Sequence, residues 1–360
     1  MNASRMHSEN EAQRAATTPV TSNDATAVGA RGQAAALGVD IGAVAIKLVL
    51  IDSQGQRLGH WQRPLQGRPA ELLATMLADE ELLSLCADAA LRIGVTGAGR
   101  NAVNGPLGRV NEIVAFSKGI AKLVPTARAA IEVGGHSARW VTLEDARGSL
   151  EDYGQNQLCA AGSGVFLEQQ GSRLRIGIEE FSRLAENAPK GATIAGRCSV
   201  FAKSDMIHLQ QKGTPPEEIA YGLCLAMARN FLATVLKGRE LHPPIILAGG
   251  GAANGGLLRA FREVFHFSEH ELLRSPLPAF ETALGAAHLA LSDSKLAPVQ
   301  GSVLAEQLQF LDNATELSML APLEVKPRTP GQTVLPPEKV RAFLGIDVGS
   351  VSTNFVLTGP

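Results

Sequence analysis

Three short segments of this sequence place glycines directly after an apolar run, a pattern that leaves backbone N–H groups open to a ligand. The residues of these segments that could contact a ligand are Asp40, Gly42 and Lys47, then Glu132, Gly134 and Gly135, then Gly249, Gly250, Gly251 and Asn254. A carboxylate at a strand end can hold a hydrated Mg²⁺, and glycine lets a phosphate or a purine ring approach the backbone. Each segment alone could be an ordinary β-turn, but the three together predict a nucleotide site.

Two of the four cysteines, Cys159 and Cys198, lie in polar, turn-like surroundings just before an expected helix. The positive end of a helix dipole favours a thiolate, and Arg197 adds a positive charge beside Cys198. Two thiolates supply half of the ligands of a [4Fe–4S] cluster, so a symmetric dimer would complete the set. Cys86 and Cys224 lie among Ala and Leu on helical stretches and are expected to be buried as small apolar residues.

The composition predicts a folded protein of about two domains, since 360 residues include 45% apolar and 19% charged types. Lys and Arg number 33 against 35 Asp and Glu, and no basic stripe is present, which argues against a nucleic-acid partner. No apolar run approaches the roughly 20 residues that cross a bilayer, and residues 1–30 lack the apolar middle of a secretory signal. We therefore expect a cytoplasmic protein without membrane contact.

Strands alternate with helical stretches from Leu37 onward, which predicts an α/β fold. The expected strands are 37–42, 45–52, 91–97, 127–135 and 243–251. One helix is expected over 72–89, and another after a capping box of Thr214 and Glu217. The apolar face of this second helix repeats every four residues and predicts burial of Ile219, Leu223, Met227, Phe231 and Val235.

The order of the three glycine turns resembles the phosphate-1, phosphate-2 and adenosine motifs of the actin, Hsp70 and sugar kinase superfamily. The resemblance covers residues 37–292 and includes a closing segment, Glu281–Ala287, that is similar to the last helix of that fold. It implies two ribonuclease-H-like lobes that close over ATP and Mg²⁺.

The segments around the two distinctive cysteines, 156–168 and 197–205, resemble the paired cysteine motifs of the ATP-dependent activators of 2-hydroxyacyl-CoA dehydratases, which are related to the ATPase subunits of benzoyl-CoA reductase. Segments 96–100, 111–113 and 131–135 are similar as well. The resemblance implies a homodimer bridged by one [4Fe–4S] cluster through Cys159 and Cys198. It also implies ATP-driven electron transfer from a ferredoxin or flavodoxin to an acyl-CoA dehydratase or reductase partner.

Two turns depart from the pattern of that family. The first has Ala43, Val44 and Ala45 where Ser and Thr are usual, and the second has His136 and Ser137 in place of Gln and Asp. The catalytic residues expected are therefore Asp40, Glu132 and His136. His136 could act as a base or could equally be a polar loop residue. We expect an ATPase whose hydrolysis is weakened by the missing hydroxyls.

The chain is expected to have four parts. Residues 1–34, rich in Ala, Thr, Ser, Asn and Gln without periodicity, predict a flexible tail before an activator-type ATPase module at 35–292. Residues 293–341 are expected to form a helical and Pro-rich linker, with five prolines between 322 and 338. The fourth part is 342–360.

Residues 344–357 repeat residues 37–50 at an offset of 307, with seven of fourteen positions identical. A lone hairpin buries little apolar surface, so 342–360 is interpreted as the start of a second ATPase module in a longer protein. It could instead add a strand to the sheet of the first module. A two-module arrangement resembles the large members of the activator family.

Two other functions stay open. A non-catalytic nucleotide-binding module would explain the missing hydroxyls. A small-molecule kinase of the same superfamily, such as an N-acetylhexosamine kinase, would need an Asp that deprotonates the sugar hydroxyl. Asp152 is the nearest candidate, and its sequence context fits that role poorly.

Overall fold

A computed structural model describes residues 34–65, 67–156, 163–195, 199–310, 341–348 and 353–358. The chain divides into two compact units, Met1–Leu311 and Asp312–Pro360. The expected cluster ligands Cys159 and Cys198 lie outside the described residues, as do nearly all of the expected tail and the Pro-rich part of the linker.

The first unit contains two sheets, and the first of them has six strands in the order β12-β4-β1-β2-β3, with β6 paired to β4. The strands are β1 (Ala34–Ile41), β2 (Ala45–Asp52), β3 (Arg57–Pro64), β4 (Ala90–Thr96), β6 (Gly108–Arg109) and β12 (Val299–Gln300). Strands β1, β2 and β3 are antiparallel, whereas β4 runs parallel to β1. Strands β1 and β2 are buried along nearly their whole length, so this sheet is covered on both faces.

The second sheet repeats the topology of the first, with the order β11-β10-β7-β8-β9. Its strands are β7 (Ala129–Val133), β8 (Ala138–Leu143), β9 (Leu150–Gln155), β10 (Ile245–Ala248) and β11 (Leu272–Arg274). Strands β7, β8 and β9 are antiparallel, and β10 runs parallel to β7. Two lobes built on one strand order confirm the predicted α/β fold with a duplicated ribonuclease-H-like topology.

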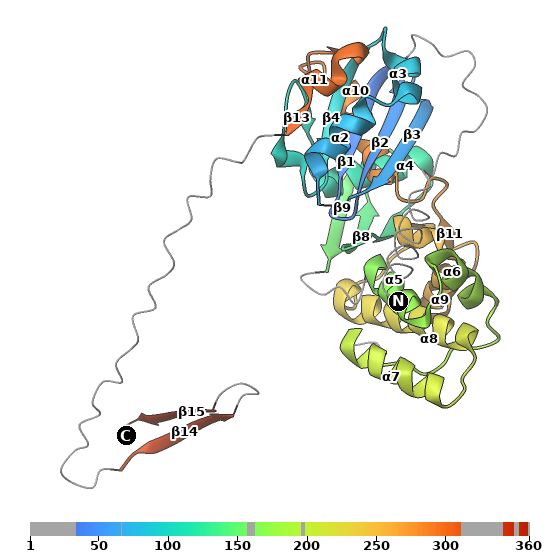
Figure 1. Ribbon diagram of the computed structural model, residues 1–360, viewed down its shortest axis with the longest axis vertical. Helices are drawn as coiled ribbons and strands as arrows, with labels where there is room; N and C mark the ends of the chain where they lie inside the picture. The colour runs from blue at the N-terminus through green and yellow to red at the C-terminus, as the bar shows by residue number, and fades with distance from the viewer. Residues whose placement is uncertain are drawn as a thin grey trace, which may run out of the picture. The chain divides into compact units, whose positions relative to one another are not determined.

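Helices cover both sheets (Figure 1). Helices α2 and α3 lie over the first sheet, and α5 to α9 gather in the second lobe. The helices are α2 (Pro69–Leu77), α3 (Glu80–Cys86), α4 (Glu112–Leu123), α5 (Gly164–Leu174), α6 (Ile178–Asn187), α7 (Ser199–Gln211), α8 (Pro216–Phe231), α9 (Gly255–Phe265), α10 (Glu281–Ser292) and α11 (Leu304–Gln307). Two short strands, β5 (Val103–Asn104) and β13 (Gln309–Phe310), pair with each other.

Helices α4 and α10 cross with their backbones in contact. A Cβ on Gly285 of α10 would lie 1.7 Å from the carbonyl oxygen of Ala115, and one on Gly119 of α4 would lie 1.8 Å from that of Glu281. On the other side of α10, a Cβ on Gly38 of β1 would lie 1.9 Å from the carbonyl oxygen of Ala283. Glycine is required at all three positions because these atoms are backbone.

Two details differ from the sequence predictions. The stretch 72–89 forms two helices, because Asp79 accepts hydrogen bonds from the N–H groups of Glu81 and Leu82 and so caps α3. The predicted capping box at Thr214 is wrong. Helix α8 starts at Pro216, and its N-cap is Pro215, which makes no side-chain cap hydrogen bond.

The apolar face predicted for α8 is buried at all five positions, from Ile219 to Val235. With the π-helical turn Leu232–Leu236 that follows, this is one helical stretch of 21 residues, Pro216–Leu236, apolar and long enough to cross a membrane by composition. Since 78% of its apolar window is buried inside the lobe, it fits a core helix.

The second unit contains a hairpin, β14 (Phe343–Val348) and β15 (Thr353–Thr358), that forms a two-stranded sheet of its own. Its pairs Leu344↔Leu357 and Asp347↔Asn354 correspond, at the same offset of 307, to Leu37↔Leu50 and Asp40↔Lys47 in β1 and β2. The sequence repeat is therefore also a repeat of strand register. Phe343 and Phe355 of this hairpin are 69% and 65% exposed.

We predict that Gly285→Ala lowers the free energy of unfolding by about 3 kcal/mol, because the added methyl group meets a backbone carbonyl that cannot move away. Denaturant unfolding of the full chain measures the effect. The control is Gly177→Ala, where nothing lies within 4 Å of the Cβ position and a change below about 1 kcal/mol is expected. Equal stability of the two variants would contradict the tight crossing.

Candidate nucleotide site

The three glycine turns meet between the lobes. The first joins β1 to β2, the second joins β7 to β8, and the third follows β10. A Cβ on Gly135 of the second turn would lie 2.4 Å from Val44 Cγ2 of the first, and one on Gly249 would lie 2.7 Å from the carbonyl oxygen of Val133. Gly249 also has a φ of +76°, which favours glycine. The turns predicted from the sequence are thus neighbours in space.

Asp40 ends β1 and lies directly opposite Lys47 of β2, whose Nζ is 3.2 Å from Asp40 Oδ2. Asp40 is buried, and its other oxygen, Oδ1, has no hydrogen-bond partner among the residues that the structure describes. The same is true of the hydroxyl of Thr96, which pairs with Asp40 across β1 and β4. Buried oxygens without partners are costly, so this pair fits a hydrated cation.

Lys47 keeps its charge in this setting. Burial lowers the pKa of Lys47, but the carboxylates of Asp40, Glu132 and Glu281 together raise it above its usual value. A charged ammonium group between the lobes is suited to phosphate oxygens.

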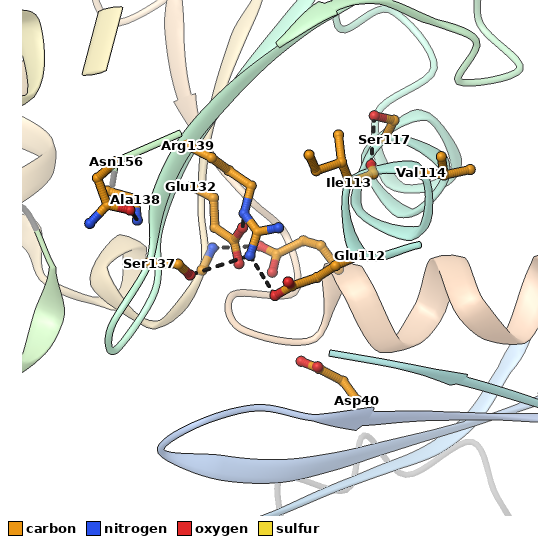
Figure 2. Close-up of polar contacts among 12 residues, drawn as sticks. Asp40, Glu112, Ile113, Val114, Ser117, Glu132, Ser137, Ala138, Arg139 and Asn156 are labelled. Carbon is orange, nitrogen blue, oxygen red and sulfur yellow. Dashed lines mark hydrogen bonds and ion pairs between the residues drawn. The ribbon is translucent and has the colours of Figure 1, made fainter. Parts of the chain in front are cut away.

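Glu132 is not a free carboxylate. It lies opposite Arg139 in the pairing of β7 with β8 and forms an ion pair with Arg139 Nε. Arg139 Nη2 lies 2.6 Å from Glu112 Oε1 and 3.3 Å from Ser137 Oγ (Figure 2). Burial raises the pKa of Glu132, and the guanidinium group opposes this shift. The predicted catalytic carboxylate is therefore held in a buried ion-pair network.

Arg139 and Glu112 were not predicted as site residues. Asn111 caps α4 by accepting a hydrogen bond from the N–H of Ile113, which places Glu112 in the first turn beside Arg139. The Nη1 atom of Arg139 is buried and has no partner in the described part of the chain. The available signal was an arginine within the largely apolar strand 138–143.

The third turn is bound to α10. The N–H of Gly249 lies 3.3 Å from Oε1 of Glu281, the first residue of α10, which is 1% exposed. Burial raises the pKa of Glu281 to about 7, although a hydrogen bond from Ser275 opposes the shift. Asn254 caps α9 through Oδ1, which accepts from the N–H of Leu257, while its buried Nδ2 has no partner among the described residues.

The remaining predicted residues lie in the turns themselves. Gly42, Gly134, Gly250 and Gly251 form the hairpin and loop backbones, and His136 is exposed in the β7–β8 turn. Ala43 is exposed, whereas Val44 contacts the second turn at Gly135. A valine therefore makes an apolar contact at one of the positions where the family usually has a hydroxyl residue.

The two cysteines within the described residues, Cys86 and Cys224, are buried free thiols, as predicted. Burial raises the pKa of Cys86 to about 11 and also raises that of Cys224, so neither fits a cluster ligand. No group of three His, Cys, Asp or Glu residues suited to a metal occurs in the described ranges. Helix α7 begins at Ser199, directly after Cys198.

Two lobes of one topology, with strand-end glycine turns facing each other and buried polar atoms between them, define an ATPase of the actin and sugar kinase fold. The chain belongs to the BadF/BadG/BcrA/BcrD ATPase family, whose model matches residues 37–290. This result confirms the resemblance to dehydratase activators and to the ATPase subunits of benzoyl-CoA reductase.

Three relatives illustrate the family. The chain is 34% identical over 192 residues to the activator of lactoyl-CoA dehydratase of Anaerotignum propionicum, covering 53% of this chain and 72% of the relative. It is 29% identical to a benzoyl-CoA reductase component of Thauera aromatica, covering 69% and 90%. The solved structure of the activator of the 2-hydroxyisocaproyl-CoA dehydratase from Clostridium difficile with bound ADPNP has 25% identity and a TM-score of 0.64, covering 72% and 95%.

We predict that Glu281 makes stability fall as pH rises. Its pKa of about 7 in the folded state lies above the ordinary 4.5, so between these values the folded state holds more protons than the unfolded state. The protein should lose roughly 3 kcal/mol from this group across the window, at about 1.4 kcal/mol per pKa unit.

The measurement is denaturant unfolding from pH 4.5 to 7.5, with Glu281→Gln compared with the native chain. The difference between the two should shrink or reverse with pH, whereas the exposed control Glu179→Gln should follow the native curve. Parallel curves for the native chain and Glu281→Gln would show that Glu281 does not titrate in this range.

Proposed function

We propose that this chain is an ATP-driven electron-transfer activator that delivers low-potential electrons through a [4Fe–4S] cluster to an acyl-CoA dehydratase or reductase. The observation that carries the ATP part is the set of buried polar atoms without partners in the described residues, which surrounds the three turns: Asp40 Oδ1, Thr96 Oγ1, Arg139 Nη1 and Asn254 Nδ2. These atoms include both acceptors for a cation and donors for an anion, as Mg²⁺ and phosphate require.

The residues take the following roles in the proposed site. Asp40 holds Mg²⁺ through bound water, and Lys47 neutralises phosphate charge. The backbone N–H groups of Gly42, Gly134 and Gly135 contact phosphate oxygens. Gly249, Gly250 and Gly251 leave room for the adenosine, next to the amide of Asn254.

The expected reaction is hydrolysis of ATP, with Arg139 as an additional phosphate ligand. Its Nη1 donor faces no partner in the described chain, and its charge is fixed because Glu132 and Glu112 raise the pKa of the guanidinium group further. Glu112, exposed in part at the start of α4, and His136 are the groups available to orient a water molecule. Glu132 acts by positioning Arg139.

Electron transfer rests on Cys159 and Cys198, which lie outside the described residues. We propose that both cysteines from each of two subunits hold one cluster, which supplies a one-electron carrier. A ferredoxin or flavodoxin would be the donor. The named activities of the relatives support this role: dehydratase activation for two of them, and a component of benzoyl-CoA reductase for the third. We also propose a cytoplasmic location and a second ATPase module that begins with β14 and β15.

The described ends of the Cys159 segment are attached to the second turn. Asn156 donates its N–H to the carbonyl of Ala138, and its Oδ1 accepts from the N–H of Ala138. On the other side, Gly164 and Val165 donate to the carbonyls of Gly134 and Gly135. A change at the phosphate-binding turn would therefore reach both ends of the segment that carries Cys159.

We predict that Asp40→Asn lowers Mg-ATP hydrolysis by roughly 100-fold, because the variant loses the charge that holds the metal. Phosphate release under saturating Mg-ATP measures it, and the exposed Asp88→Asn serves as the control with native turnover. Native turnover in Asp40→Asn would refute the role of Asp40. Tight ATP binding by the native chain without any turnover would identify a non-catalytic nucleotide module instead.

A second prediction concerns iron. Protein purified without oxygen should be brown, with four irons per two chains, and Cys159→Ser or Cys198→Ser should remove the colour because each removes two of four ligands in the dimer. Cys86→Ser is the matched control and should keep the iron. Iron and acid-labile sulfide analysis measures the outcome. An iron-free native protein would contradict the electron-transfer role and leave the ATPase role in place.

A further inference from the structure

A pocket of about 460 Å³ lies at the far ends of the two crossing helices from the nucleotide turns. Its walls are the turn between β2 and β3, the last residues of α4, the segment 276–277 after β11, and the middle of α10. Helix α4 reaches the nucleotide site with its first residue and this pocket with its last two, roughly 16 Å away at 1.5 Å per residue. The proposed ATPase leaves this pocket without a role.

The charged groups that line the pocket are all basic. Arg57 comes from the β2–β3 turn, Lys122 from α4 and His288 from α10, and the described lining contains no Asp or Glu. The remaining lining residues are polar or apolar and add no charge: Gln54, Gly55, Gln56, Leu123, Pro276, Leu277 and Leu284. Lys118, one turn before Lys122, acts on His288 as well.

The nearest carboxylate in the turn is already engaged. Asp52 is 8% exposed, and its Oδ1 accepts hydrogen bonds of 2.8 Å from the N–H groups of Gln54 and Gln56. These bonds fix the turn that carries Arg57. The negative charge of Asp52 therefore serves the turn, and the rim of the pocket keeps its positive character.

His288 forms an inner wall of the pocket. It is 9% exposed, and its ring packs so closely on Gly55 that a Cβ there would lie 2.5 Å from Cε1. Burial, with the charges of Lys122 and Lys118, lowers the pKa of His288 to about 4. The imidazole is therefore neutral at pH 7 and offers one N–H donor. The positive potential that helps to keep it neutral would attract an anion.

We propose that this pocket binds a small molecule that carries a carboxylate or a phosphate on an apolar body. The anionic group would lie between Lys122, Arg57 and the N–H of His288. The apolar body would contact Leu123, Leu277 and Leu284, and the volume is within the range of about 300–1,000 Å³ common to small-molecule sites. Because the walls come from both lobes, the ligand would contact both sides of the hinge.

The test uses the full chain and four eight-carbon probes at pH 7.5, with binding measured by calorimetry. Octanoate and octyl phosphate are the anions, octanol is neutral, and octylamine is a cation. At least one anion should bind about tenfold more tightly than octanol and octylamine, since charge-assisted hydrogen bonds add to the apolar contact. The anion that binds better identifies the head group.

Two variants locate the binding. Lys122→Gln and His288→Phe should each weaken anion binding by about tenfold, and the phenyl ring preserves the packing on Gly55. Lys212→Gln, an exposed lysine after α7, is the matched control and should bind as the native chain does. Equal binding by all three variants, or anions that bind no better than octanol, would overturn the proposal. The assay needs neither ATP nor iron, so its result is independent of the proposed electron-transfer function.

Discussion

The backbone contact between α4 and α10 sets the geometry of the nucleotide site. Gly119 and Gly285 let the helices approach to a distance at which no side chain fits, and α10 presses equally closely on β1 at Gly38. The first residue of each helix then reaches a different turn: Glu112 binds Arg139 beside the second, and Glu281 binds Gly249 in the third. A shift in the crossing would therefore move two turns at once.

The charges of the site are arranged in pairs that leave one atom of each sign without a partner in the described chain. Asp40 binds Lys47 through one oxygen and keeps the other unbonded, and Arg139 binds two carboxylates while Nη1 stays unbonded. Removing one partner from a buried ion pair is strongly destabilising, so these pairs must persist when a ligand binds. A metal and a phosphate bound together complement both unbonded atoms without breaking either pair.

The sequence predicted the turns because their signal is local. A strand that ends in glycine is visible in a few residues, and Asp40 and Glu132 stand beside theirs. Arg139, Glu112 and Glu281 could not be assigned in this way, since their partners are 27 or more residues distant in the chain except where strand register pairs Glu132 with Arg139. The capping box failed because a second proline took the first helical position.

The loss of hydroxyls in the first turn and the attachment of the Cys159 segment concern different turns. Val44 meets Gly135 through apolar contact alone, so the first turn influences the second by shape. Asn156, Gly164 and the second turn are joined by backbone hydrogen bonds that do not involve residues 43–45. A chain with this sequence can therefore lose catalytic groups for hydrolysis while the path from bound phosphate to the cysteine segment stays intact. Hydrolysis rate and coupling are separable properties here because they depend on separate loops.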